Sequence, residues 1–126
     1  MFEPQQARVL VVDDEAPIRL TLEAILQRVG YTVTTAANGE EALAWLMEHR
    51  FDLLLLDLRL TGISGLEVAQ YAREYQPSAV VLILTGSSDF KGMPIEEQVG
   101  HFDYLLKTAS PQEVVDRVAA ALLTAR

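Results

Sequence analysis

The sequence predicts a doubly wound α/β fold, in which helices cover both faces of a parallel β-sheet. Short apolar runs alternate along the chain with longer segments whose apolar residues recur at helical spacing. One of these runs, Phe51–Leu56, is apolar throughout except for Asp52, which is typical of a central parallel strand buried on both faces. Right-handed crossovers then restrict how the strands connect.

Five strands are expected from the apolar runs. The first is rich in β-branched residues, and the third and fourth are the most apolar. The predicted strands are Val9–Val12, Tyr31–Thr35, Phe51–Leu56, Ala79–Leu84 and Tyr104–Leu106.

About five helices are expected between and after these strands. Pro17 opens the first, at a position where its missing N–H costs nothing, and Gly30 ends it. The next two begin near Gly39 and Gly65. The segment Ser110–Glu113 is a capping box that opens the last helix. The region 87–100 is the least regular, since Gly92 and Pro94 break any long helix.

Length and composition favour a single domain spanning residues 1–126 with one hydrophobic core. The absence of cysteine excludes disulfides, thiolate metal sites and a cysteine nucleophile, and it is compatible with a cytoplasmic location. A net charge of −8 disfavours direct contact with nucleic acid or anionic membrane. The apolar runs, such as Leu53–Leu56, are far too short to cross a bilayer.

Polar residues follow the predicted strands where each strand ends. These residues are Asp13, Asp14, Asp57, Thr85 and Lys107. In doubly wound sheets, ligands bind outside the carboxyl ends of the strands, so these side chains should converge at one edge.

The five residue types together suit phosphoryl chemistry. Clustered carboxylates repel one another and favour a hard divalent cation such as Mg²⁺. A carboxylate can also be the nucleophile toward a phosphoryl group, while a lysine supplies positive charge and a threonine hydroxyl donates a hydrogen bond. The sequence therefore predicts a metal site with a nucleophile, a cation and a hydrogen-bond donor.

These motifs, in their order and spacing, resemble the receiver domain of two-component response regulators over nearly the whole chain. The matching segments are Val9–Glu15, Leu54–Arg59, Leu82–Gly86 and Asp103–Lys107. The resemblance implies a flavodoxin-like (βα)5 fold with a five-stranded parallel sheet in the order 2-1-3-4-5. It also implies a phosphorelay switch rather than an enzyme.

The resemblance assigns the phosphoacceptor and its metal site. Asp57 would receive a phosphoryl group from a histidine kinase or a phosphotransfer protein, and the domain would assist both this step and its own dephosphorylation. Asp14 and Asp57 would bind Mg²⁺ directly, Asp13 largely through water, and Arg59 through its backbone carbonyl. Lys107 would contact the phosphoryl oxygens.

The resemblance also implies how the signal leaves the site. Thr85 would move to hydrogen-bond the phosphoryl group, and Tyr104 would swing inward behind it. This coupled motion would change the face formed by the fourth helix, fifth strand and fifth helix, where an output domain or partner protein would bind. The sequence leaves open whether the protein forms a homodimer.

Two positions depart from the family pattern. Thr108 follows Lys107, where the family usually has a proline with a cis bond, so we expect either a trans bond with a rearranged loop or a strained cis bond. Either arrangement is expected to shift Lys107 and slow the switch. Thr61 stands where a proline is frequent, which predicts a looser loop after Asp57.

Two other functions are compatible with the motifs. A pseudo-receiver would keep the fold as a protein-binding module but phosphorylate poorly because Thr108 displaces Lys107. A metal-dependent phosphatase would share the aspartate nucleophile, but it would normally carry a second aspartate two residues after Asp57, where this chain has Arg59.

Overall fold

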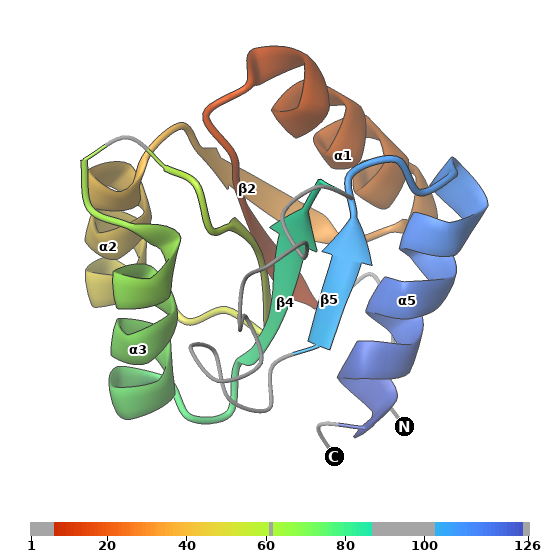
Figure 1. Ribbon diagram of the computed structural model, residues 1–126. Coiled ribbons are helices and arrows are strands. Elements are labelled where there is room, and N and C mark those ends of the chain that lie inside the picture. The colour runs from red at the N-terminus through yellow and green to blue at the C-terminus, as the bar shows by residue number, and fades with distance from the viewer. Residues whose placement is uncertain (1–6, 61, 87–102, 125–126) are drawn as a thin grey trace.

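The computed structural model describes residues 7–60, 62–86 and 103–124, which form one five-stranded parallel sheet with helices on both faces (Figure 1). The strands lie in the order β2-β1-β3-β4-β5, and every neighbouring pair is parallel. Their bounds are β1 Arg8–Val12, β2 Thr32–Ala36, β3 Leu53–Asp57, β4 Val80–Thr85 and β5 Asp103–Leu106. The helices are α1 Ala16–Val29, α2 Gly39–Glu48, α3 Gly65–Tyr75 and α5 Pro111–Thr124.

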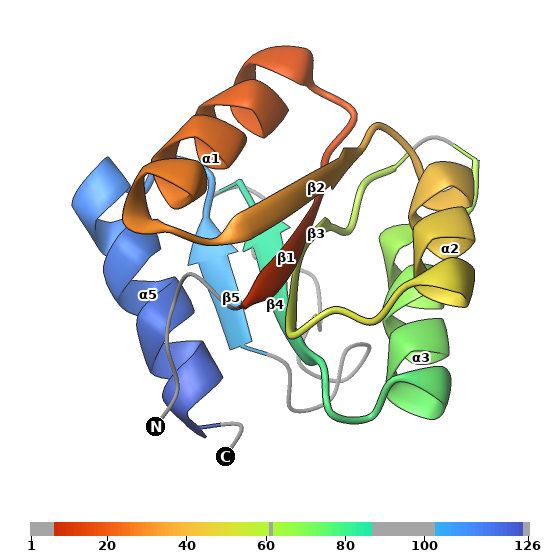
Figure 2. The same ribbon diagram turned by 180° about the vertical axis from the view of Figure 1, so that it is seen from behind.

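The two faces of the sheet are covered by different helix pairs. Helices α1 and α5 lie on one face, and α2 and α3 lie on the other (Figures 1 and 2). Alternate residues of one strand serve the two faces, because strand side chains point in opposite directions with a period of two. In β1, Val9 and Val11 join the core on the α1 side, while Leu10 and Val12 join the core on the α2 side.

The ends of the helices follow the residues that the sequence singles out. Gly30 adopts a left-handed conformation with φ 117°, and its N–H donates to the last turn of α1. At the start of α5, the Glu113 N–H donates to Ser110 Oγ at 3.1 Å, and the Ser110 N–H donates to Glu113 Oε1 at 3.0 Å. The hydrogen bonds from Ser110 lower the pKa of Glu113, and the predicted capping box is confirmed.

The predicted fold class and strand order are confirmed, with small shifts at the element ends. Tyr31 precedes β2 rather than opening it, because its N–H donates to Leu26 O at the end of α1. Four helices lie in the described parts of the chain. The irregular region 87–100, including Gly92 and Pro94, falls outside the described residues, so its lack of a long helix remains a prediction.

Candidate functional site

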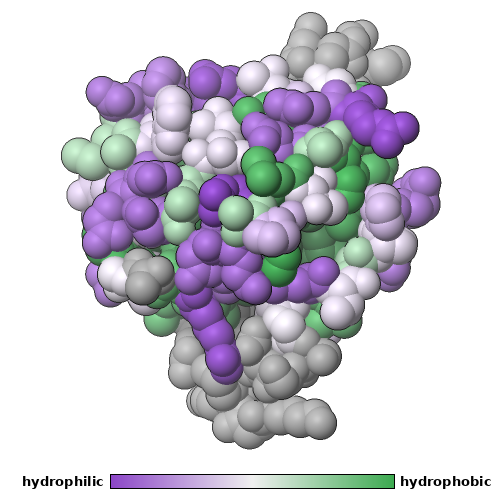
Figure 3. Space-filling view, turned by 90° about the horizontal axis from the view of Figure 1, so that it is seen from above, coloured by the Kyte–Doolittle hydropathy of each residue, from purple (hydrophilic) through white to green (hydrophobic). Residues whose placement is uncertain are grey.

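The parallel strands bring the predicted polar residues to one edge of the sheet. Asp57 is the last residue of β3 and Thr85 the last of β4, while Asp13 directly follows β1 and Lys107 directly follows β5. Asp13, Asp57 and Thr85 are buried even though they are polar. Figure 3 looks onto this edge and shows hydrophobic surface beside hydrophilic surface. A buried polar cluster at the strand ends is the arrangement expected of a ligand site.

Lys107 contacts three carboxylates of the cluster. Its Nζ lies 2.8 Å from Asp57 Oδ2, 3.1 Å from Glu15 Oε1 and 3.2 Å from Asp13 Oδ2. Its side chain is only 15% exposed. Three carboxylates therefore share one largely buried ammonium group.

Burial and charge pull the pKa of Asp57 in opposite directions. Desolvation raises it, the hydrogen bonds from Lys107 and from the Arg59 N–H lower it, and the neighbouring charge of Asp13 raises it again. The net effect is a raised pKa, so the ionised form of Asp57 is less favourable in the fold than in water. Its partner Lys107 compensates only part of the cost of burying this carboxylate.

The pKa of Lys107 is raised as well. Burial alone would lower it, but the hydrogen bond and charge of Asp57, with the neighbouring carboxylates of Glu15 and Asp13, outweigh that effect. The ammonium group is therefore fully protonated at neutral pH. It is available to neutralise additional negative charge at Asp57.

Backbone groups fix the orientation of the two buried carboxylates. The Arg59 N–H donates to Asp57 Oδ1 at 2.9 Å, and the Glu15 N–H donates to Asp13 Oδ1 at 2.8 Å. Arg19 Nη1 donates to the Asp13 carbonyl at 2.8 Å. Each carboxylate is thus held by one oxygen, while its second oxygen faces Lys107.

The carboxylates fit a divalent cation. One oxygen each from Asp13, Asp14 and Asp57 lies within 4.8 Å of the other two. Asp13 Oδ2 is buried and has no hydrogen-bond donor among the described residues, although Lys107 lies at ion-pair distance. A buried carboxylate oxygen without a hydrogen bond is costly, and a metal ion or its bound water would satisfy it. Oxygen-only donors of this kind suit Mg²⁺.

The two residues assigned to the switch lie on neighbouring strands. Thr85 is buried, its hydroxyl donates to the Gly86 carbonyl at 3.1 Å, and its own carbonyl accepts from the Lys107 N–H at 2.8 Å. Tyr104 is 45% exposed and its carbonyl accepts from Arg117 Nη2. In the ladder between β4 and β5, Tyr104 pairs with Ile83, two residues before Thr85.

Thr108 does not displace the lysine before it. The Lys107–Thr108 peptide bond is trans, as are the other described peptide bonds. Of the two predicted conformations, the trans form is therefore the one found. The expected shift of Lys107 away from the site is not observed, since its Nζ is at hydrogen-bond distance from Asp57.

The loop after Asp57 packs tightly against β3. A Cβ atom on Gly65 would lie 2.2 Å from the Asp57 carbonyl oxygen, so only glycine fits there. The Gly65 N–H donates to the Leu58 carbonyl at 3.2 Å. The start of α3 is therefore tied directly to the residue beside Asp57. Thr61 itself lies outside the described residues, so the predicted looseness of this loop remains a prediction.

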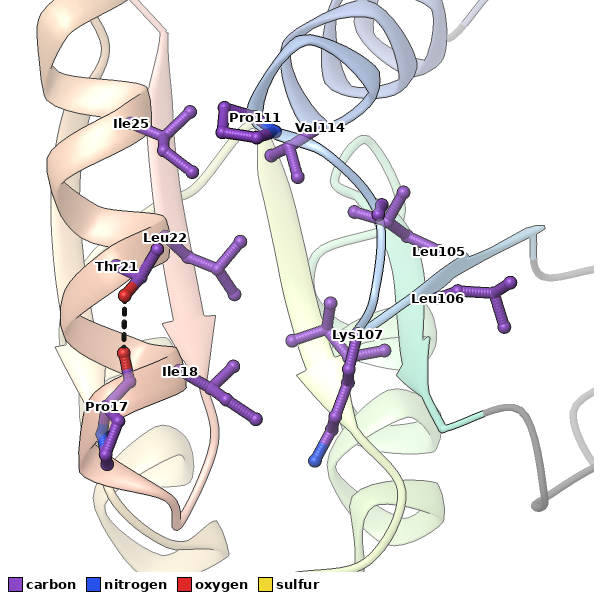
Figure 4. Close-up of a pocket in the computed structure, with 12 residues that line it drawn as sticks. Pro17, Ile18, Thr21, Leu22, Ile25, Leu105, Leu106, Lys107, Pro111 and Val114 are labelled. Carbon is purple, nitrogen blue, oxygen red and sulfur yellow. Dashed lines mark hydrogen bonds between the residues drawn. The ribbon is translucent and has the colours of Figure 1, made fainter.

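An apolar groove of about 290 Å³ opens beside the cluster, between α1 and the loop from β5 to α5. Leu22 and Ile25 of α1 lie on the side of Val114 of α5, and Lys107 lies at the rim of the groove (Figure 4). Thr21 also lines the groove, with its hydroxyl donating to the Pro17 carbonyl. Lys107 thus belongs to both the polar cluster and the groove.

Sequence reasoning missed two residues that contact the cluster, Glu15 and Arg19. Glu15 lies 92 positions from Lys107 in the sequence, yet the two side chains form a hydrogen bond. Glu15 directly follows the Asp13-Asp14 pair and Arg19 lies in the first turn of α1, so their proximity to a strand end was the available signal.

Comparison with known proteins decides the family. The family described as response regulator receiver domain matches residues 9–119. The chain belongs to this family. It is therefore a signalling domain of two-component phosphorelay systems, and its acidic cluster fits the family's phosphorylation site.

Receiver-domain relatives cover almost all of this chain. It is 39% identical over 122 residues to the transcriptional regulatory protein ResD of Bacillus subtilis, covering 97% of this chain and 50% of ResD. It is also 39% identical over 118 residues to the DNA-binding transcriptional regulator NtrC of Salmonella typhimurium, covering 94% of this chain and 25% of NtrC. The chain thus spans half or less of these relatives.

Solved structures agree with the fold. The response regulator TrrA of Thermotoga maritima, in complex with Mg²⁺ and BeF, is 37% identical with a TM-score of 0.79, covering 92% of this chain and 99% of TrrA. The chemotaxis response regulator CheY4 of Vibrio cholerae is 31% identical with a TM-score of 0.81, covering 91% and 98% of the two chains.

Proposed function

We propose that Asp57 is the phosphoacceptor of this receiver domain and that Lys107 and Thr85 support its phosphorylation. The observation that carries this proposal is the contact of 2.8 Å between Lys107 Nζ and the buried carboxylate of Asp57. A nucleophilic carboxylate beside a protonated amine suits the transfer of an anionic group. Asp13 belongs to the same oxygen cluster, but its distance to Lys107 Nζ is longer, at 3.2 Å.

In the proposed reaction, Asp57 Oδ2 attacks the phosphorus of a phosphohistidine on the donor protein. The P–N bond breaks as the P–O bond forms, and the released imidazole nitrogen takes up a proton. Lys107 neutralises charge on the phosphoryl oxygens, and the Thr85 hydroxyl is positioned to donate to one of them after a small movement.

Asp13, Asp14 and Asp57 would hold Mg²⁺ with the backbone carbonyl of Arg59. When bound, the ion supplies positive charge that offsets the crowded carboxylates and orients the phosphoryl oxygens. The cluster of acidic oxygens, and the lack of a hydrogen bond to the buried Asp13 Oδ2, support this assignment. The Mg²⁺-bound state of the relative TrrA supports it independently.

The domain is proposed to assist both its own phosphorylation and its dephosphorylation by water. The acyl phosphate of Asp57 is the high-energy state of the switch, and its hydrolysis resets the carboxylate. Thr85 and Tyr104 are the proposed relay to the surface of β5 and α5, where Tyr104 and Leu106 are exposed. An output domain, a partner protein or a second copy of the chain would bind this surface. The fourth helix of the predicted output face lies outside the described residues.

A histidine kinase or phosphotransfer protein is the proposed phosphodonor. The donor must bring its phosphohistidine over Asp57, and the apolar groove next to Lys107 is the surface beside that path. No helix in the described parts of the chain is long and apolar enough to cross a membrane. The proposed location is the cytoplasm, with which the acidic, cysteine-free composition is compatible.

Blocking the groove is expected to slow phosphorylation by a protein donor but not by a small-molecule donor. Thr21 is exposed and lines the groove, so Thr21→Arg should slow transfer from a histidine kinase at least tenfold by steric and charge obstruction. Phosphorylation by acetyl phosphate should change less than twofold. Gln70→Arg, on the exposed side of α3, is the matched control and should leave both rates unchanged. Equal slowing by both substitutions would contradict donor docking in the groove.

Mg²⁺ titration tests the proposed function against the pseudo-receiver. Wild type should bind Mg²⁺ and gain stability, by about 1.4 kcal/mol at ten times the dissociation constant. Asp57→Asn should weaken binding because it removes one charged ligand. Calorimetric titration and thermal unfolding measure both effects, and absence of binding by wild type would support the pseudo-receiver. Turnover of a generic phosphomonoester would support a phosphatase instead, although Arg59 occupies the position of its second aspartate.

A further inference from the structure

Glu15 is an exposed residue that contacts the buried centre of the site. Its side chain is 59% exposed, whereas that of Asp57 is 2% exposed, yet both carboxylates bind the same Lys107 ammonium. The backbone of Glu15 takes part as well, since its N–H donates to Asp13 Oδ1. Its side chain is therefore placed at the mouth of the site, next to the lysine proposed to contact the phosphoryl group.

The contacts of Lys107 leave little capacity for a new anion. An ammonium group has three N–H donors, and two of them are in hydrogen bonds to Asp57 and Glu15 while Asp13 lies at 3.2 Å. A phosphoryl group on Asp57 adds oxygens that need the same donors. When Asp57 Oδ2 becomes the bridging oxygen, the N–H that it accepts passes to a phosphoryl oxygen. A second contact between Lys107 and the phosphoryl group then requires the N–H that now serves Glu15 or the one that faces Asp13.

Glu15 is the partner that is easiest to release. Its carboxylate is already largely in water, so losing the ion pair leaves it solvated, and exposed pairs are weak. Asp13 is fully buried, and separating it from Lys107 would leave an uncompensated charge in the interior. The three contacts of Lys107 are thus unequal.

We propose that Glu15 is a positioning residue that competes with the phosphoryl group for Lys107. In the unphosphorylated protein it holds the ammonium at the mouth of the site, and phosphorylation displaces it into water. The carboxylate therefore lowers both the phosphorylation rate and the stability of the phosphorylated state. This inference rests on the proposed role of Asp57 and deepens it.

Two substitutions separate the contact of Glu15 from its charge. Glu15→Gln removes the charge and weakens the hydrogen bond, while Glu15→Asp keeps the charge but withdraws the carboxylate by one methylene from the contact at 3.1 Å. Glu40→Gln is the matched control for the loss of charge. The Glu40 carboxylate lies beside Gly62, in the loop after β3, and not beside Lys107. This substitution removes one negative charge without touching Lys107.

The probe is beryllofluoride in the presence of saturating Mg²⁺, with affinity measured by calorimetric titration. Both Glu15→Gln and Glu15→Asp should bind it two- to fivefold more tightly than wild type, the range expected for loss of an exposed ion pair. Their rates of phosphorylation by acetyl phosphate should rise by a similar factor. Glu40→Gln should match wild type in both measurements, and thermal unfolding without ligand should be nearly unchanged in all variants.

Three results would overturn the proposal. Equal affinity in wild type and both Glu15 variants would mean that Glu15 does not compete for Lys107. Tighter binding by Glu15→Gln but not by Glu15→Asp, or an equal gain in Glu40→Gln, would assign the effect to overall charge instead of the contact. Weaker binding by either Glu15 variant would mean that Glu15 supports Lys107. Failure of wild type to bind beryllofluoride would instead refute the proposed function itself, and the Glu15 inference with it.

Discussion

Asp57→Asn is expected to abolish phosphorylation and, without Mg²⁺, to raise the free energy of unfolding by roughly 1–2 kcal/mol. The amide is not a nucleophile, so no acyl phosphate forms. The gain in stability arises because Asp57 is buried beside Asp13 and only partly compensated by Lys107, which the raised pKa of Asp57 reflects. Urea unfolding at neutral pH, with EDTA present, measures the difference.

The stability gain of Asp57→Asn should depend on pH. A carboxyl group whose pKa is raised by folding contributes stability that is present below its unfolded pKa, about 3.9, and lost as the pH rises through its folded pKa. The advantage of the asparagine should therefore be small in acid and reach its full size at neutral pH.

Asp52→Asn is the control for Asp57→Asn. Asp52 is an exposed carboxylate just before the start of β3, and its Oδ2 accepts the Arg8 N–H at 2.7 Å. Because the asparagine can keep this acceptor, its effect should stay within about 0.5 kcal/mol at any pH. A loss of stability in Asp57→Asn would contradict the inference that Lys107 only partly compensates the burial of Asp57 beside Asp13.

Lys107→Met should produce the largest loss of stability among these substitutions. Removing the ammonium leaves Asp13 and Asp57 buried without their counter-charge, which is expected to cost about 3 kcal/mol of unfolding free energy in the absence of Mg²⁺. The phosphorylation rate should fall about 100-fold, as for the loss of a positioned donor to transition-state charge. Urea unfolding and the rate of phosphorylation by acetyl phosphate measure the two effects.

The stability effect of Lys107→Met should become much smaller when Asp57 is also neutral. In a double-mutant cycle, Asp57→Asn should remove much of the cost of Lys107→Met, because the two groups contact each other at 2.8 Å. A lysine whose pKa is raised by folding contributes stability that is lost only as the pH rises through that raised value, so the coupling should persist across neutral pH. Additive effects of the two substitutions would contradict the pair as the centre of the site.

Much of the fold follows from local pattern. The apolar runs that become β1, β3 and β4 are buried in the structure, and the capping box of Ser110 and Glu113 forms as the sequence predicts. The sequence also predicts that the polar side chains converge, since parallel strands that end in polar residues present them at one edge of the sheet. Sequence reasoning therefore placed Asp13, Asp57, Thr85 and Lys107 together.

Other features depend on packing that no local pattern encodes. The contact of Glu15 with Lys107 joins residues 92 positions apart and depends on the angle at which α1 leaves β1. The apolar groove between α1 and α5 is a gap in side-chain packing, which residue types alone do not predict.

Asp57 is proposed to form an acyl phosphate that depends on Mg²⁺, and intact mass spectrometry detects this modification. Wild type and Asp57→Asn are each incubated with acetyl phosphate, in the presence of either Mg²⁺ or EDTA, and their intact masses are measured. A single phosphoryl adduct is expected on wild type with Mg²⁺, removed by hydroxylamine and absent from the other three samples. An unmodified wild type, or an adduct that persists in Asp57→Asn, would contradict it.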